Sequence, residues 1–196
     1  TNGERITTHE YGVFFDSEWL YPDTAAEGAA TANLFCARNA DACFQILTDL
    51  TVAAGTLIGV SFSATECQAT VYQLLPAHVG ENSGPKTHTT TDYESVKHFV
   101  TRKAPFDVYE ITRPLDSGML RAGRVAFFVR VDVPADAIPG EYNEALTLTV
   151  GEEAFTVPVH IKIYHATVPT LADASFHMVN WIYYNKLASH HSVVPF

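Results

Sequence analysis

The chain has 196 residues, a formal net charge of −10, 47% apolar residues and 12% aromatic residues. This composition is ample for a packed core, and the 17% of charged residues argues against a disordered chain. The excess of acids disfavours nucleic acid as a partner, because phosphate contacts need clustered lysine and arginine. No apolar run reaches the roughly 18 residues that suggest a membrane helix.

The length fits one large domain, or one domain and part of another. Basic residues gather in the middle, where residues 86–130 hold eight Lys or Arg against five Asp or Glu. We interpret this region as a solvated face rather than an anion-binding patch. The chain starts at Thr1 and shows no basic, apolar leader, which favours a cytoplasmic location and leaves secretion open if a leader was removed.

Three cysteines, Cys36, Cys43 and Cys67, are an odd number without C-x-x-C spacing. A disulfide framework and a zinc site are therefore not indicated, and we predict free thiols, with a Cys36–Cys43 pair as the alternative. We expect no metal and no cofactor, and the phosphate-binding G-x-x-x-x-G-K-[ST] motif is absent. The G-x-S-x-G motif that a hydrolase triad would need is absent as well.

The first half of the chain contains several short β candidates, rich in β-branched and aromatic residues. An aromatic stretch ends at the turn signal Pro22-Asp23. The candidates after it are CFQILTDL (43–50), TLIGVSFS (56–63) and ATVYQLLPAHV (69–79). Residues 80–98 are polar and broken by Gly and Pro, which predicts a long surface loop.

The second half gives clearer strand signals. After FDVYEI (106–111), apolar residues alternate with other residues at 125–133 and again at 146–150, which is the period of a strand. Between these two runs, Pro139-Gly140 predicts a tight turn. The longest strand signal is 154–169, in which Pro158 predicts an edge strand or a bulge because proline cannot donate to a ladder.

Seven or eight strands without a convincing helix predict an all-β fold, an antiparallel β-sandwich of the immunoglobulin or jelly-roll kind, over residues 1–170. The composition changes after Pro169, and Phe176–Tyr184 is an apolar segment that a finished sandwich does not need. We therefore predict that residues 171–196 are a linker and the first strand of a second domain.

Two motifs carry a resemblance to a known family. VRVDVPADAIPGEYNEALTLTV, followed by FTVPVHIKIYHATVPT, resembles a P-G-x-Y-x-G turn and the strand after it, and LFCARNADACFQIL resembles an A-R-N-E-x-x-x-F-Q motif. Both are similar to the N-terminal β-sandwich of bacterial multidomain proteins related to glycoside hydrolase family 123. Ala40 stands where that family has Glu and loses a possible partner for a basic side chain, and Glu144 stands where it has Gly.

The resemblance implies that a (β/α)8 barrel follows and that its Asp–Glu pair hydrolyses N-acetylhexosaminides, with the substrate's acetamido group as nucleophile. No such pair occurs here at the end of a predicted strand, since Glu152-Glu153 falls in a predicted hairpin turn. We therefore expect no catalytic residues in this chain. Its expected role is that of a non-catalytic accessory domain, which supports its own C-terminal barrel and shapes one rim of the substrate cleft.

Candidate substrate-binding residues lie in the predicted first strand of the barrel, because barrel enzymes build their sites at the strand ends. Asn180 is suited to hydrogen-bond a sugar hydroxyl and Trp181 to stack on a sugar ring, and His177 precedes them. The alternative for Trp181 is core or interdomain packing. The adjacent pair His190-His191 does not indicate a metal site, because neighbouring histidines rarely bind one ion in good geometry.

Two alternative functions remain open at the level of sequence. The first is an independent carbohydrate-binding module, whose aromatic platform would come from Trp19, Tyr21, Tyr72, Tyr93 and Tyr109. The second is an immunoglobulin-like domain that binds a partner protein.

Overall fold

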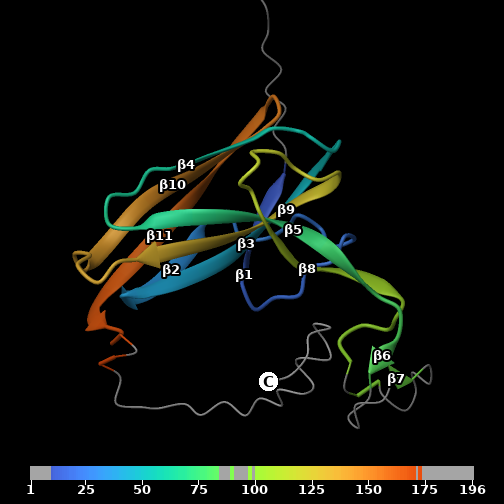
Figure 1. Ribbon diagram of the computed structural model, residues 1–196, viewed down its shortest axis with the longest axis horizontal. Coiled ribbons are helices and arrows are strands. Elements are labelled where there is room, and N and C mark those ends of the chain that lie inside the picture. The colour runs from blue at the N-terminus through green and yellow to red at the C-terminus, as the bar shows by residue number, and fades with distance from the viewer. Residues whose placement is uncertain (1–9, 84–88, 91–96, 99, 171, 174–196) are drawn as a thin grey trace, which may run out of the picture.

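The computed structural model describes residues 10–83, 89–90, 97–98, 100–170 and 172–173. These residues form an all-β fold in which two main sheets lie face to face, with a small two-stranded sheet at one side (Figure 1). The strands are β1 Tyr11–Phe15, β2 Ala32–Arg38, β3 Ala40–Val52, β4 Ile58–Phe62, β5 Gln68–Val79, β6 Asn82–Ser83, β7 Thr89–Thr90, β8 Phe106–Pro114, β9 Gly123–Val133, β10 Gly140–Val150 and β11 Glu153–Thr167.

The strand order is β1-β3-β9-β5-β8 in the five-stranded sheet and β2-β11-β10-β4 in the four-stranded sheet. The neighbours run antiparallel, with one exception: β2 pairs with β11 in parallel, with Ile161 opposite Leu34. The prediction of a sandwich is confirmed, and the prediction that it is antiparallel throughout is wrong for this pair. The two strands are more than 100 residues apart in sequence, so no local pattern indicates their direction.

The core lies between the two sheets and consists of the strand faces predicted from period-two alternation. Alternate residues are buried there along part of each of β9, β10 and β11, and the members are Val125, Phe127, Val129, Val131, Val133, Leu146, Leu148, Val150, Phe155, Val157, Val159, Ile161 and Ile163. The predicted hairpin is confirmed, since β10 pairs with β11 from Gly140 opposite Ile163 to Val150 opposite Glu153.

The position of Pro158 differs from the prediction. Its strand, β11, is an inner strand of its sheet, between β2 and β10. Opposite Pro158, Ala145 exchanges hydrogen bonds with Ser63 on its other side, so the backbone of Pro158 faces away from β10. On the side it does face, pairing with β2 starts one residue later, at Val159. The proline is tolerated because its missing N–H has no ladder partner there.

A second, smaller apolar cluster covers the outer face of the five-stranded sheet. It is made of Leu20, Leu47, Leu74, Tyr109 and Ala126, with Phe14 and Phe128 packed against it. Leu20 comes from the segment between β1 and β2, and its carbonyl accepts a hydrogen bond from the Tyr109 backbone N–H at 2.8 Å. This segment therefore lies on the outer face of the sheet and shapes the surface there.

The polar region 80–98 contains the short pair β6–β7, so the prediction of a loop without strands is wrong at those residues. The predicted start of a barrel at 171–196 falls almost entirely outside the described residues. Within the described part of the chain, no helix is long and apolar enough to cross a membrane.

Candidate functional site

The corner at Arg38 and Asn39 joins the two sheets and holds the chain where it leaves the sandwich. Asn39 has φ 56°, in the left-handed region that asparagine tolerates, and this conformation turns the chain from β2 into β3. The Asn39 side chain donates to the Val168 carbonyl at 2.7 Å, and Arg38 Nη2 donates to the His165 carbonyl at 2.9 Å. The A-R-N motif thus fastens the end of β11, and we call this part of the molecule the exit end.

The loop before β10 belongs to the same end. The predicted tight turn at Pro139-Gly140 is wrong in position, because the turn lies at Ala135-Asp136 and Gly140 is already the first residue of β10. The Tyr142 hydroxyl donates to the Ile138 carbonyl at 2.7 Å and so ties the start of the strand to the loop before it. A Cβ on Gly140 would lie 3.4 Å from the Tyr142 ring, so the ring packs against the backbone at the start of β10. The P-G-x-Y pattern therefore has a structural explanation here, comparable to a tyrosine corner.

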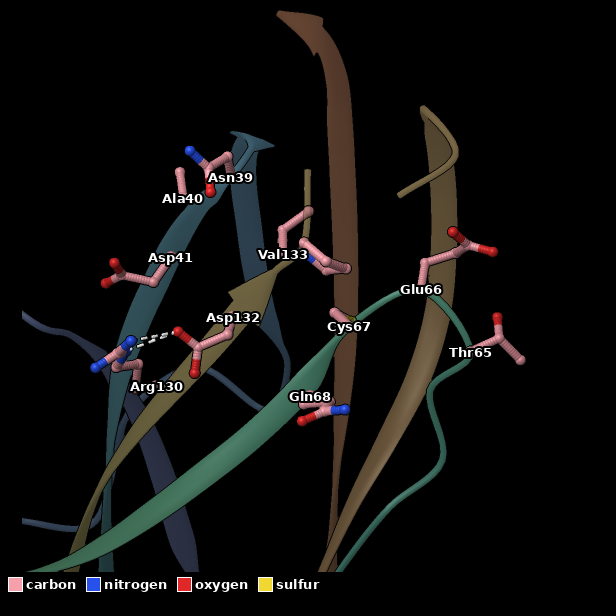
Figure 2. A pocket seen from close by; sticks show the side chains of 11 residues that line it. Asn39, Ala40, Asp41, Thr65, Glu66, Cys67, Gln68, Arg130, Asp132 and Val133 are labelled. Atoms are coloured by element: carbon pink, nitrogen blue, oxygen red, sulfur yellow. Dashed lines mark hydrogen bonds and ion pairs between the residues drawn. The ribbon is translucent and has the colours of Figure 1, made fainter. Parts of the chain in front are cut away.

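A pocket of about 450 Å³ opens beside this corner. Figure 2 shows its lining side chains, which come from the β2–β3 corner, the segment before β5 and the end of β9. Three of these residues are acids, namely Asp41, Glu66 and Asp132, and one is a base, Arg130. In Figure 2, Asp41 and Glu66 lie on opposite sides of the pocket and their carboxylates point apart.

Each of these carboxylates holds a neighbouring group. Asp132 binds Arg130, with Oδ1 2.5 Å from Nη2 and 2.9 Å from Nε. Glu66 Oε2 accepts from the Ile138 backbone N–H at 2.7 Å, and Asp41 Oδ2 accepts from Cys43 Sγ at 3.6 Å. Asp41 and Asp132 are opposite each other in the β3–β9 pairing, and all three carboxylates of the pocket bind groups of the fold itself. The described residues also contain no cluster of His, Cys, Asp or Glu suited to a metal ion.

All three cysteines are free thiols, as predicted. Burial, with a contribution from Asp41, raises the pKa of Cys43 to about 12. Burial also raises the pKa of Cys67 to about 11, and that of Cys36 above its usual value. The thiolate is the reactive form, so these side chains are poor nucleophiles near neutral pH.

The sequence-based candidates are distributed unevenly in the structure. His177, Asn180 and Trp181 lie outside the described residues, as does His190-His191, so their proposed roles stay predictions. Gly151 and Glu152 form the turn between β10 and β11, as predicted, and Glu153 is the first residue of β11.

The aromatic residues of the binding-module alternative do not form one platform. Tyr109 is buried, and Tyr21 packs below the guanidinium of Arg102 at 4.5 Å. Tyr72 is half-buried beside Phe128, with ring centroids 6.4 Å apart. Trp19 is exposed and lines another pocket, and Tyr93 lies outside the described residues.

The architecture defines the chain as a two-sheet β-sandwich domain. In comparison with solved structures, it superposes on part of a family 123 glycoside hydrolase from Clostridium perfringens, with a TM-score of 0.64 and 13% sequence identity. The match covers 96% of this chain and 32% of that protein. It shows that the two share this fold, and that the chain spans about a third of the length of the hydrolase.

Other solved structures match more weakly. A cohesin from Acetivibrio cellulolyticus covers 81% of this chain and all of its own, with 6% identity and a TM-score of 0.30. Domains 4 and 5 of the S-layer protein SbsC cover 74% of this chain and 54% of their own, with 13% identity and a TM-score of 0.32. No protein-family model and no curated protein sequence matches the chain.

Proposed function

We propose that this chain is a non-catalytic accessory domain of a carbohydrate-active protein related to family 123 glycoside hydrolases, and that it supports a catalytic barrel that follows it. The observation that carries the proposal is the structural match, which covers nearly all of this chain and 32% of the hydrolase. The remaining length of that protein leaves room for the domain that performs its chemistry. In the exit-end pocket, Asp132 binds Arg130 and Glu66 binds the Ile138 backbone N–H, which agrees with a supporting role for these carboxylates.

The exit end is the surface that we propose docks against the barrel. Large apolar side chains are exposed there: Ile138 is 63% exposed, Val168 is 44% exposed, and Phe35 and Tyr164 stand nearby on the outer face of the four-stranded sheet. Exposed apolar groups that gather near one point are typical of an interaction surface. Val168 follows the end of β11 and its N–H donates to the Arg38 carbonyl, and Ile138 comes shortly before Gly140, which pairs with Ile163 of β11.

The guanidinium of Arg38 adds a polar argument for docking at this end. Its Nε is buried and has no hydrogen-bond partner among the described residues, although Nη2 binds the His165 carbonyl. A buried donor without a partner costs about 1–3 kcal/mol. In the resembling family, a Glu stands at the position of Ala40, so here an acceptor from the following domain would fill that role.

Two measurements test this proposal. The purified chain, incubated with p-nitrophenyl N-acetyl-β-D-galactosaminide, should release no nitrophenol above the buffer rate, and turnover by the pure chain would overturn the non-catalytic role. In the parent protein, Ile138→Glu and Val168→Glu should separate the melting of the two domains. Leu57→Glu is the matched control, because Leu57 is also 63% exposed but lies by the β10–β11 turn at the opposite end. Equal effects of all three variants would contradict docking through the exit end.

A further inference from the structure

A second pocket lies away from the exit end, on the outer face of the five-stranded sheet. It measures about 300 Å³, at the small end of the range for ligand sites. One wall is the segment that follows β1, with Asp16, Ser17 and Trp19, and the other is β8, with Glu110 and Thr112. Gln45 and Phe128 form part of its floor. The proposed docking surface does not include any of these residues.

Trp19 is held in an exposed position. Its side chain is 56% exposed, whereas the next residue, Leu20, is 1% exposed. The carbonyl before it, of Glu18, accepts from Gln45 Nε2 at 2.8 Å, and the carbonyl of Leu20 accepts from the Tyr109 backbone N–H. Because the backbone is fastened on both sides, the indole is presented at the pocket by the fold itself.

The polar groups of this pocket include acceptors that the fold does not use. No hydrogen bond or ion pair within the described residues engages the carboxylate of Asp16 or of Glu110. Gln45 is 4% exposed, and its amide nitrogen donates to the carbonyls of Phe15 and Glu18. Its Oε1 accepts no hydrogen bond from the described residues. The pocket thus combines an aromatic surface with acceptors at its base and rim.

The charge of the pocket limits what it binds. Asp16, Glu18 and Glu110 are its charged lining residues, and the lining contains no Lys, Arg or His. Anionic ligands are therefore repelled. A neutral sugar suits the arrangement, because one face of a pyranose ring is apolar and packs on an aromatic ring, while its hydroxyls donate to carboxylate and amide oxygens.

We infer that this pocket is a binding site for a neutral pyranose of a glycan, with Trp19 as the stacking group and Glu110, Asp16 and Gln45 as hydrogen-bond acceptors. The site stands on its own geometry and goes beyond the proposed supporting role. A sugar bound here would keep the protein on a glycan without taking part in bond cleavage. Loss of this binding leaves the docking test at the exit end unaffected, so the two proposals fail separately.

The test uses the whole 196-residue chain and nuclear magnetic resonance. The chain has two tryptophans, so it has two indole N–H cross-peaks, and Trp19→Phe assigns them. Lactose, cellobiose and N,N′-diacetylchitobiose serve as neutral probes, digalacturonate as the anionic probe and deacetylated chitobiose as the cationic one. We expect at least one neutral probe to shift the Trp19 peak in a saturable manner, and digalacturonate to leave it in place.

Calorimetry on variants then locates the site. Trp19→Ala should weaken binding at least ten-fold and Glu110→Gln about three- to ten-fold, with amide spectra showing that both variants are folded. Phe35→Ala removes an exposed aromatic ring from the other sheet, and it should bind the probe as tightly as the unsubstituted chain does. The inference is overturned if no neutral probe shifts the Trp19 peak, if only the cationic probe does, or if Trp19→Ala binds as tightly as the unsubstituted 196-residue chain.

Discussion

Replacing Gln45 by leucine tests how the fold holds the segment that carries Trp19. Gln45 is the last residue of the A-R-N-E-x-x-x-F-Q motif, and its amide nitrogen donates to the carbonyls of Phe15 and Glu18, both at 2.8 Å. Leucine fills a similar volume but cannot donate. The variant should therefore lose these two short hydrogen bonds, and a longer one to the Asp16 carbonyl at 3.4 Å, while it keeps most of the packing.

The expected loss follows from these two bonds. Each contributes about 0.5–1.5 kcal/mol net, so Gln45→Leu should lower the free energy of unfolding by about 1–3 kcal/mol. For a domain of this size, that corresponds to a fall in melting temperature of about 2–12 °C. The backbone at Glu18 should also open more often, which limited proteolysis with an enzyme that cleaves after glutamate detects directly.

Gln73→Leu is the matched control. Gln73 is also buried, but its amide bonds the backbone of Arg121, with its Nε2 3.1 Å from the carbonyl and its Oε1 2.9 Å from the N–H. It should lower the melting temperature without faster cleavage at Glu18. An unchanged melting temperature for Gln45→Leu, or equal cleavage at Glu18 in both variants, would refute the role assigned to Gln45.

Three further predictions concern thiols, glycines and acid. At pH 8, Ellman's reagent should react with the thiols of the folded chain at least about 100-fold more slowly than with those of the chain in urea. The reason is that the pKa of Cys43 is raised to about 12 and that of Cys67 to about 11. Fast labelling of the folded chain would contradict this burial. Gly28→Ala should lower the free energy of unfolding by about 1–3 kcal/mol in a urea titration, since its Cβ would lie 2.6 Å from the Val13 carbonyl oxygen. Gly59→Ala is the control and should be nearly neutral, because its Cβ would lie 3.5 Å from Thr149. Similar urea midpoints for the two variants would show that the backbone at Gly28 shifts to make room. The pKa values of Asp23 and Glu141 are lowered by Arg102 and Lys162, so both pairs stabilise the fold above the carboxyls' ordinary pKa near 4, and this contribution is lost as the pH falls through the lowered values. Thermal melts between pH 3 and 7 should therefore show a smaller loss of stability on acidification for Asp23→Asn than for the parent, and identical pH profiles would refute the contribution of the Asp23–Arg102 pair.

The sequence predicts most strands of this fold because their inner faces are uniformly apolar. In the rows from Val125 to Val133 and from Phe155 to Ile163, every second residue is a large apolar side chain that points inward and is buried. Local patterns do not encode which strands become neighbours. The parallel pairing of β2 with β11, and with it the tolerance of Pro158, depends on contacts across more than 100 residues and could not be predicted.

The candidate sites were less predictable than the strands. The exit end could be anticipated in part, because the A-R-N and P-G-x-Y motifs mark its two loops. The pocket at Trp19 could not, because its walls come from a loop and from β8, about 90 residues further along the chain. The sequence named Trp19 only as one of five aromatic residues that could form a platform, and that set also included Tyr109, which is buried.

The position of β11 between β2 and β10 affects how the domain responds to mechanical force. A load applied to the chain beyond Thr167 pulls this strand along its own axis, in shear against β2 and β10. In that direction the ladder bonds must rupture together rather than unzip one by one. We therefore expect the sandwich to resist unfolding when force is applied at its exit end, because that force acts on β11, its longest strand.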